Sequence, residues 1–397
     1  MARLLADSLA ETALPADALA EMEALNDEAA PLHIWLRTRA NLPLQPAWHE
    51  AAQTPIPDPQ PPGSVTGPAA PLRVLPHIWK WRDIEPYLHR IAEIAPLEFT
   101  DRQQFLLTNP GLGGALKVTN TIRIAVSIYK SGDFAPQHLH SPNASRTILS
   151  DAGGYTLIEG EKCIAGRGDL ILTPAGTWHG HGNDGAEPVI WMDVLDWPLL
   201  EHLDVIWIRH DHAERGDNAE PPVEDYSQKL YGAGGMVPRF VPESRASGQG
   251  GTPMFHFKGG NVGETLSGLR DQQGSPWDGI IIEFVNPMNG ASLFPVLTYK
   301  AQLLRPAEET QPFRHTASTV YTVLEGRGVT EVNGRRLEWE KNDIFVVPAN
   351  MWRRHVNLAG DADAVLYSLS DEPLLKAIGQ YRAQGRPDDS DVIEITG

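Results

Sequence analysis

The sequence predicts a mostly β protein built from two copies of one small β domain. The chain has 397 residues, and at about 150 residues per domain two or three units are expected. From residue 72 onward, short β-branched and aromatic runs are separated by Gly, Pro, Asn and Asp, as in sandwiches and small barrels. The segment YTVLEGRGVTEVNGRRLEWEKNDIFVVP repeats the strand-turn-strand order of RTILSDAGGYTLIEGEKCIAGRGDLILTP about 175 residues later.

The elements follow in order along the chain. Within residues 15–30, Leu19, Met22 and Leu25 recur at helical spacing among acidic residues and predict an amphipathic helix. The stretch 51–71 is rich in proline and glycine, which is typical of an extended arm. The clearest strands are TIRIAVSIYKSGD, YTLIEGEKC and DLILTPAG. We expect an N-terminal helix and arm at 1–71, a first β unit at 72–204, a connector at 205–260, a second β unit at 261–375 and a tail at 376–397.

Composition and charge narrow the function classes. A net charge of −18 has the wrong sign for a nucleic-acid phosphate backbone, and no basic stripe is present, so small molecules are the expected partners. No stretch approaches the roughly 20 apolar residues that span a bilayer. Asp7 and Glu11 interrupt the apolar N-terminus before a signal-peptide core forms. Cys163 is the single cysteine, which excludes a disulfide framework. We expect a cytoplasmic protein with no membrane or nucleic-acid partner.

Three histidines in the first copy have the spacing of a shared metal site. His138 and His140 are two residues apart, so they point to the same face of a strand. His179 follows the turn at 174–176 and comes from a different strand. Most single histidines are structural, but three at this spacing predict a facial metal site with open positions on its other side.

These spacings resemble the two cupin motifs, Gly-x5-His-x-His and Gly-x5-Pro-x-Gly-x2-His-x3-Asn. The first begins at Gly132, and the second runs from Gly168 to Asn183. The resemblance implies a bicupin of two double-stranded β-helix (jelly-roll) barrels. The usual fourth ligand, a glutamate, is absent, because residues 141–146 read SPNASR. A site without that anion leaves room for a bidentate substrate and O2, and stays more positive toward an anionic substrate.

Further segments are similar to the gentisate 1,2-dioxygenase family, which includes dioxygenases for salicylate, substituted salicylates and 1-hydroxy-2-naphthoate. They are PHIWKWRDIEPYL, NPGLGG, GDLILTPAGTWHGHGN, VNPMNG and VYTVLEGRG, within about residues 75–375. The resemblance implies one Fe(II) per chain on His138, His140 and His179, and a homotetramer. It also implies an ortho-hydroxybenzoate that binds iron through its carboxylate and phenolate, and is opened by O2 between the carbons that carry those groups.

The same resemblance assigns roles beyond the ligands. Arg146 and His181 lie where the family holds the substrate carboxylate, and Arg102 matches another arginine of the site. Asp193 matches an aspartate that orients the histidine beyond the ligands. A guanidinium pairs bidentately with a carboxylate, which suits Arg146, and His181 alternates with His179 and so faces the same cavity. Ordinary ion pairs for Arg102 and Asp193 and a core hydrogen bond for His181 are the alternatives.

Arg123 begins the strand before the metal motif, RIAVS, where relatives acting on gentisate or salicylate carry polar or aromatic residues. It could meet an anionic or nitro substituent of the substrate, although an outward-facing arginine is the commoner case. In the second copy, the histidine positions 138, 140 and 179 align with Phe313, His315 and Arg353, and position 181 aligns with His355. We therefore expect the second unit to be metal-free and structural.

Two other function classes remain as alternatives within the cupin resemblance. A bicupin that oxidises or decarboxylates small acids would be expected to have the glutamate ligand that is missing here. A non-catalytic storage or sugar-binding bicupin would have no use for an intact histidine triad. A 1-hydroxy-2-naphthoate dioxygenase of the same family stays open, because the walls of the pocket decide the ring substituents.

Overall fold

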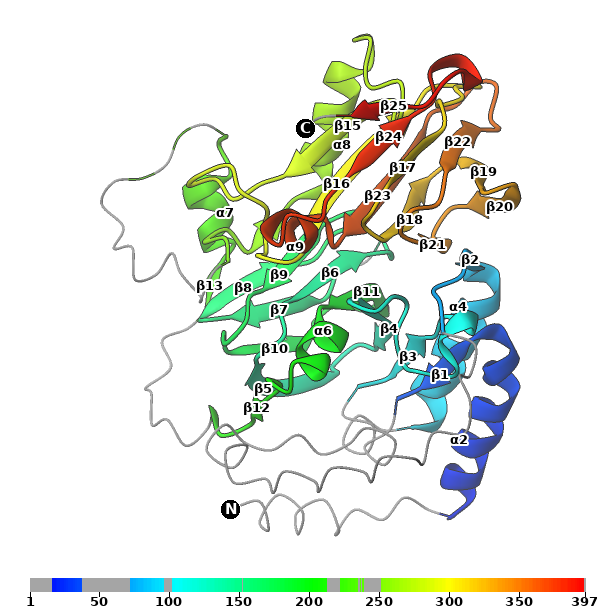
Figure 1. The fold of residues 1–397 in the computed structure, drawn as a ribbon. Coiled ribbons are helices and arrows are strands. Elements are labelled where there is room, and N and C mark those ends of the chain that lie inside the picture. Colours follow the sequence, from blue (N-terminus) through cyan, green and yellow to red (C-terminus); the bar gives the residue numbers. More distant parts are fainter. Residues whose placement is uncertain are drawn as a thin grey trace, which may run out of the picture.

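The computed structural model describes residues 16–37, 72–95, 102–151, 153–212, 222–234, 236, 238 and 251–395. Two β units lie one above the other, the lower one drawn mainly in cyan and green and the upper one in yellow to red (Figure 1). The expected duplicated, mostly β architecture is confirmed. The arm expected at 51–71 lies outside the described residues.

The first unit consists of two sheets, rich in the β-branched and aromatic residues that favour strands. In hydrogen-bonded order, the seven-stranded sheet contains β1 (Ile34–Leu36), β3 (Gln104–Leu107), β4 (Arg123–Tyr129), β11 (Val189–Leu195), β6 (Ala144–Ile148), β9 (Leu170–Thr173) and β14 (His256–Phe257). The six-stranded sheet contains β12 (Ile208–Arg209), β5 (Phe134–His140), β10 (His179–Gly182), β7 (Tyr155–Ile158), β8 (Glu161–Ile164) and β13 (Val223–Glu224).

The second unit repeats this strand order. One sheet contains β15 (Ile280–Phe284), β16 (Thr298–Leu304), β23 (Ala364–Ser370), β18 (Thr319–Glu325), β21 (Ile344–Val347) and β2 (His77–Trp79). The other contains β20 (Arg335–Glu340), β19 (Arg327–Val332), β22 (Arg353–Asn357), β17 (Phe313–His315), β24 (Ala383–Gly385) and β25 (Ile393–Ile395). The order β4-β11-β6-β9 in one unit corresponds to β16-β23-β18-β21 in the other, as a duplication requires.

Each unit consists of two facing sheets, in keeping with the expected jelly-roll architecture, and among the described residues the two sheets do not close into one continuous barrel. Every sheet has two ends, and no described strand joins the two sheets of a unit. An apolar cluster fills the space between the sheets of the first unit, with Tyr129 and Ile148 from one sheet and Ile158 and Cys163 from the other. A corresponding cluster lies within the second unit.

The units exchange edge strands, which the expected boundaries did not foresee. β2 lies between β1 and β3 of the first unit in sequence but pairs with β21 of the second, so that His77 lies opposite Val346 (Figure 1). In return, β14 pairs with β9 of the first unit, with His256 opposite Ile171. The expected connector, 205–260, therefore supplies β12, β13 and β14, and the expected tail, 376–397, supplies β24 and β25.

Both exchanged strands lead into helices that are capped by the other part of the chain. α4 (Trp81–Ile94) begins after β2, and the N–H of Trp81 donates to Oδ1 of Asp343 at 2.7 Å. α8 (Gly259–Leu269) begins after β14, and the N–H of Gly259 donates to Oδ1 of Asp169 at 2.7 Å. A carboxylate at a helix N-terminus satisfies an otherwise unpaired N–H and interacts favourably with the helix dipole.

The predicted N-terminal helix is present as α2 (Ala16–Ala29), and its Met22 and Leu25 are buried. α4 packs an apolar face through Ile84, Leu88 and Ile91, at the spacing expected of an amphipathic helix. The remaining helices are short: η1 (Ala30–Leu32), η2 (Pro110–Leu112), α6 (Trp197–His202), α7 (Tyr226–Tyr231), α9 (Glu372–Ala377) and η5 (Pro387–Asp389).

The largest apolar cluster lies between the two units. It joins Val126 and Met192, from the seven-stranded sheet, to Leu303 and Val346 of the second unit. Full burial of one such side chain contributes roughly 1.5–3 kcal/mol. The two units therefore stabilise each other through a common core.

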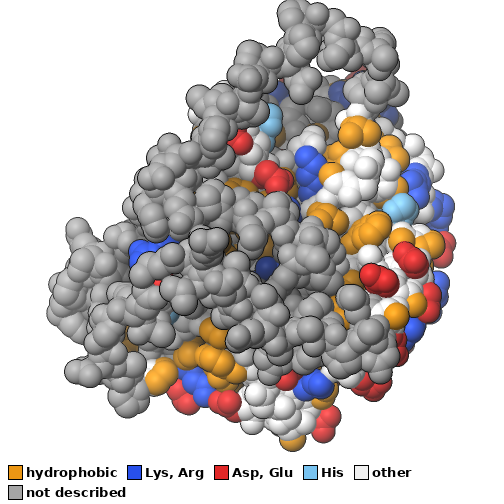
Figure 2. Space-filling view, turned by 90° about the horizontal axis from the view of Figure 1, so that it is seen from below, with side chains coloured by type: hydrophobic (Ala, Val, Ile, Leu, Met, Phe, Trp, Pro, Cys, Tyr) orange, Lys and Arg blue, Asp and Glu red, His pale blue; other side chains and the backbone are white. Residues whose placement is uncertain are grey.

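The surface carries both signs of charge. On the described part of the face in Figure 2, acidic and basic side chains are interspersed among apolar ones. Within the described ranges, no helix is both long enough and apolar enough to cross a membrane.

Candidate metal centre

The three predicted ligands meet inside the first unit. β5 carries His138 and His140, and His179 starts the neighbouring strand β10, directly opposite His138. The turn before β10 contains Gly176 at φ +72°, a left-handed conformation that glycine adopts without strain. All three side chains are buried, and their ligand atoms lie within 4.8 Å of one another. Among the described residues, this is the one group of His, Cys, Asp and Glu side chains that could hold a common ion.

The outer ring nitrogens are fixed by the backbone. Nδ1 of His138 lies 3.2 Å from the carbonyl oxygen of Pro136, and Nδ1 of His140 lies 2.8 Å from that of Pro142. Nδ1 of His179 lies 2.9 Å from the carbonyl oxygen of Thr177. Because a carbonyl only accepts, each Nδ1 carries the proton, and each Nε2 keeps its lone pair for a ligand.

The electrostatics of the triad fit a metal. Burial lowers the pKa of His140 to about 3 and lowers the pKa values of His138 and His179 well below their ordinary value. The imidazoles are therefore neutral, which is the form that ligates. Nε2 of His140 and of His179 is buried with no hydrogen-bond partner. Unsatisfied buried acceptors are costly, and an ion at the centre of the triad would satisfy them.

Arg102 reaches the triad from the segment just before β3. Its side chain is buried, and one Nη contacts Nε2 of His138. Its Nε is buried without a hydrogen-bond partner. The structure thus places a permanently charged guanidinium, with a spare donor, at the edge of the triad.

Arg146 lies on β6, in the opposite sheet, and is almost completely buried. Its Nη2 donates to Nε2 of His181 at 2.9 Å, and its Nη1 donates to the hydroxyl of Thr173 at 3.1 Å. Nδ1 of His181, which lies 3.2 Å from Oγ1 of Thr156, must then carry the ring proton. Burial lowers the pKa of Arg146 to about 10, which leaves it charged at neutral pH.

Asp193 holds the arginine rather than the histidine, which corrects the role expected from the resemblance. Its Oδ1 lies 3.2 Å from Nε of Arg146, because the two residues face each other on β11 and β6. Its Oδ2 accepts hydrogen bonds from the hydroxyl of Ser127 at 2.5 Å and from the indole of Trp191 at 3.2 Å. Asp193 therefore reaches His181 through Arg146, and through Trp191, whose ring centroid lies 5.8 Å from that of His181.

Arg123 has its contacts elsewhere. Its Nε donates to the carbonyl oxygen of Leu116 at 3.1 Å, and its guanidinium lies over the ring of Trp197, 4.6 Å from the centroid. Nη2 of Arg123 lies 4.0 Å from a carboxylate oxygen of Glu201. A role for Arg123 toward a substrate substituent stays a prediction.

Several polar residues of this region were not expected from the sequence. Ser127 and Gln104 extend the polar network around Asp193, with their side-chain oxygens 3.0 Å apart. A polar residue in a wholly buried strand such as RIAVSIY was the available signal. His210, just after β12, places its ring centroid 5.8 Å from that of His138 at an interplanar angle of 23°. No motif spacing indicates His210, because it comes from a segment outside both motifs.

The second unit presents different groups at the same positions. Phe313 and Arg353 face each other across β17 and β22, as His138 and His179 do across β5 and β10. His315 is half-buried, whereas His140 is buried, and its Nε2 lies 3.3 Å from the hydroxyl of Thr319. Phe313 and Arg353 therefore occupy, in the second unit, the positions of two of the three predicted ligands.

Known proteins are similar to this chain in sequence and in fold. The Cupin domain family matches residues 125–195 and 301–370, one stretch in each unit. The chain is 38% identical over 319 residues to a 5-aminosalicylate 1,2-dioxygenase of Comamonas sp, covering 78% of this chain and 81% of that protein. It is 33% identical over 327 residues to a gentisate 1,2-dioxygenase of Haloferax sp, covering 78% and 87%.

A solved structure extends the likeness. The salicylate 1,2-dioxygenase of Pseudoaminobacter salicylatoxidans, in its adducts with gentisate, matches with a TM-score of 0.72 and 26% sequence identity. The match covers 94% of this chain and 96% of that one. The arrangement of two cupin units described above is thus common to both proteins.

Proposed function

Because the chain belongs to the gentisate 1,2-dioxygenase family of ring-cleaving enzymes, we propose that it opens the ring of an ortho-hydroxybenzoate with O2. The bond between the carboxyl-bearing and hydroxyl-bearing carbons breaks, and each carbon receives one oxygen atom of O2. The product is a single open-chain molecule with a 2-oxo acid at one new end and a carboxylic acid at the other. Both atoms of O2 enter this molecule, so the electrons balance without an outside reductant. The observation that carries the proposal is a neutral, buried histidine triad with Arg102 beside it.

The metal we propose is one Fe(II) per chain, held by His138, His140 and His179. Imidazole ligands suit iron, and reactions of O2 with organic molecules commonly use a redox-active centre such as non-haem iron. When bound, the ion supplies the redox chemistry that lets O2 react with the ring. The fixed Nδ1 contacts of the triad support the proposal, because they leave all three donor nitrogens pointing inward.

The chain's own residues bind and orient the substrate. Arg102 has an unpartnered Nε–H and a charge at the edge of the triad, so we assign it to the substrate carboxylate. Arg146 and His181 form a rigid pair on the other side of the triad, held by Asp193. We assign this pair to positioning the substrate, with Arg146 supplying positive charge. His210 covers the triad from outside the motifs.

The names of the relatives guide the choice of substrate. The relative with 38% identity is named for 5-aminosalicylate, and others are named for gentisate, 5-nitrosalicylic acid and 1-hydroxy-2-naphthoate. Each of these molecules carries a carboxylate next to a hydroxyl group. We therefore place 5-aminosalicylate and gentisate first in the panel and retain 1-hydroxy-2-naphthoate.

The test is oxygen uptake by protein reconstituted anaerobically with Fe(II). We expect one O2 consumed per molecule of at least one panel member, together with a new absorbance band of the ring-opened product. 4-Hydroxybenzoate is the matched control, because its hydroxyl and carboxylate are not adjacent, and it should give no uptake. Absence of uptake with salicylate, gentisate, 5-aminosalicylate and 1-hydroxy-2-naphthoate would contradict the proposal.

Two further expectations accompany this function. We propose that the protein acts in the cytoplasm and assembles as a homotetramer. Light scattering coupled to size-exclusion chromatography measures the assembly directly, and a mass of one chain would contradict it.

A further inference from the structure

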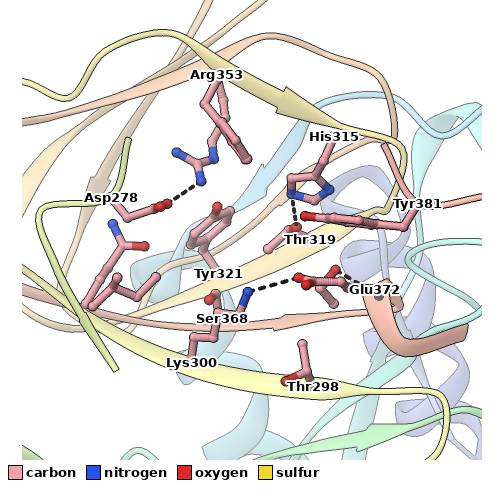
Figure 3. A pocket seen from close by; sticks show the side chains of 14 residues that line it. Asp278, Thr298, Lys300, His315, Thr319, Tyr321, Arg353, Ser368, Glu372 and Tyr381 are labelled. Carbon is pink, nitrogen blue, oxygen red and sulfur yellow. Dashed lines mark hydrogen bonds and ion pairs between the residues drawn. The ribbon is translucent and has the colours of Figure 1, made fainter. Parts of the chain in front are cut away.

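The second unit contains a polar cavity of about 70 Å³ between its two sheets. Gln302, Tyr321 and Ser368 line it from one sheet, and Phe313 and Arg353 line it from the other. Figure 3 shows these walls converging, with Arg353 and His315 on one side and Lys300, Ser368 and Glu372 on the other. The partly exposed Lys300 and Tyr381 lie at its rim.

This cavity occupies the place that the metal centre has in the first unit. Tyr321 pairs with Ser368 as Arg146 pairs with Asp193, and Arg353 stands at the position of a ligand. Gln302 faces Leu366, two residues before Ser368, as Ser127 faces Trp191 two residues before Asp193. The duplication has therefore kept the chamber while its lining has changed.

The charges that line the cavity are already compensated. Arg353 donates from Nη1 to the carbonyl oxygen of Trp277 at 2.8 Å and from Nη2 to Asp278. Lys300 donates to Glu372 at 2.9 Å (Figure 3). A carboxylate ligand would bring an uncompensated charge into a largely buried site with no net charge, which is unfavourable. The lining thus favours an uncharged molecule.

The hydrogen-bonding groups left over are mixed in kind. Gln302 is 1% exposed, and both its carboxamide nitrogen and its oxygen lack partners. Nε of Arg353 is likewise buried without a partner. One acceptor and at least two donors are therefore unsatisfied in the same chamber. A carboxylate could serve only the donors, whereas hydroxyl groups donate and accept.

We propose that this chamber binds a small uncharged polyol of three or four carbons. One water needs about 10–15 Å³ of such volume, so the cavity of about 70 Å³ accommodates roughly five waters, or a ligand of similar size. An ortho-hydroxybenzoate is about twice as large. Gln302 holds one hydroxyl by accepting and another by donating, and Arg353 donates to a third oxygen.

The test measures binding of ¹³C-labelled glycerol to the iron-loaded enzyme by NMR titration, without aromatic substrate. We expect saturable binding that weakens at least about tenfold in Gln302→Leu, which keeps the size of the side chain and removes its polar atoms. Gln272→Leu alters an exposed glutamine away from the cavity and should leave binding unchanged. Ser368→Ala is a second, milder change in the lining, and should also weaken binding.

Several outcomes would overturn the proposal. They are a strictly linear glycerol response in the wild-type protein, equal binding by the wild-type protein and Gln302→Leu, or saturable binding of acetate without binding of glycerol. The circular-dichroism spectrum of Gln302→Leu should match that of the wild type and so establish that the variant is folded. If Gln302→Leu does not fold, the comparison rests on Ser368→Ala, and unchanged binding there overturns the proposal. Because no aromatic substrate is present, failure of the ring-cleavage proposal leaves this test unaffected.

Discussion

The two β units have the same strand order but different chemistry at matching positions. The first unit places His138 opposite His179, and the second places Phe313 opposite Arg353. Neutral imidazoles can share an ion, whereas a phenyl ring has no donor and a guanidinium is always protonated. The comparison shows that the fold supplies a chamber and that a few donor atoms decide whether the chamber can be a metal centre.

The charged residues that lie just before corresponding strands of the two units also differ in sign. Just before β3, Arg102 brings a cation to a histidine. Just before β15, Asp278 brings an anion to Arg353. Each unit thus receives from the same place in its fold a group that complements its own chamber.

The first prediction, which has the largest expected effect, replaces a predicted metal ligand of the first unit with the residue at the matching position of the second. His179→Arg places a fixed positive charge among the ligands, so we expect metal content to fall from one ion per chain to nearly none. Oxygen uptake should fall to the level of buffer without enzyme. The matched change, Arg353→His, leaves Phe313 in place, and elemental analysis should still find one ion per chain. Two ions per chain in the wild-type protein would contradict a metal-free second unit.

The second prediction concerns the buried ion pair between Arg146 and Asp193, whose matching positions in the second unit hold the uncharged Tyr321 and Ser368. Asp193→Asn leaves the charge of Arg146 buried without its partner, which costs about 3–5 kcal/mol of the free energy of unfolding. Ser368 stands at the matching position, and Ser368→Ala should change the free energy of unfolding far less. Urea denaturation measures both. Equal effects of the two substitutions would show that the pair does not stabilise the fold.

The third prediction tests the cation at the edge of the triad. Arg102→Met removes the charge that we assign to the substrate carboxylate, and such truncations cost about 2–5 kcal/mol of binding free energy. We expect kcat/KM to fall accordingly with the iron content unchanged. Asp278→Asn, the corresponding change in the second unit, should leave kcat/KM as it was. A loss of iron in Arg102→Met would instead indicate that the arginine supports the metal site.

The fourth prediction has the smallest expected effect and concerns His256, which holds the exchanged strand β14 to the first unit. His256 is buried with Nε2 2.6 Å from Asp169 and Nδ1 2.9 Å from Asp225, and Lys258 and Glu161 lie nearby. Burial lowers the pKa of His256, but the two carboxylates outweigh burial and raise it above its ordinary value of 6.5. In the second unit the corresponding contact is made by Lys80, whose Nζ lies 2.5 Å from a carboxylate oxygen of Asp343.

Because the folded pKa of His256 exceeds the unfolded one, its stabilisation is fully present below about pH 6.5 and is lost as the pH rises through the raised value. We expect His256→Gln to be less stable than the wild type by on the order of 1 kcal/mol at pH 6, because it loses the hydrogen bonds that the charged ring makes with Asp169 and Asp225. The difference should shrink at higher pH. A difference that stays constant in urea denaturation from pH 6 to pH 9 would contradict a charged His256.

The duplication and the triad were predictable because their signals are local. His138 and His140 reveal a shared face by their spacing alone, and the repeated strand-turn-strand order reveals two copies. Strand exchange has no such signal. β2 has three residues and β14 has two, and neither shows a periodicity that could indicate a partner strand in the other unit.

The network around the triad was only partly predictable. The sequence indicates that Arg146 and Asp193 belong to the site, but their ion pair depends on the register between β6 and β11. That register results from packing of whole sheets, which no motif encodes. The contact of Arg102 with His138 is likewise not encoded by a motif. Arg102 lies just before β3, whereas His138 lies on β5 of the other sheet.

The exchanged strands also determine when each unit can finish folding during synthesis. β2 emerges from the ribosome early, but its partner β21 follows about 270 residues later. The first unit in turn lacks its edge strand β14 until most of the chain has been made. A half-length fragment would therefore expose an unpaired sheet edge in either unit. The second unit is needed to close the first unit's shared core, whatever its own chamber holds.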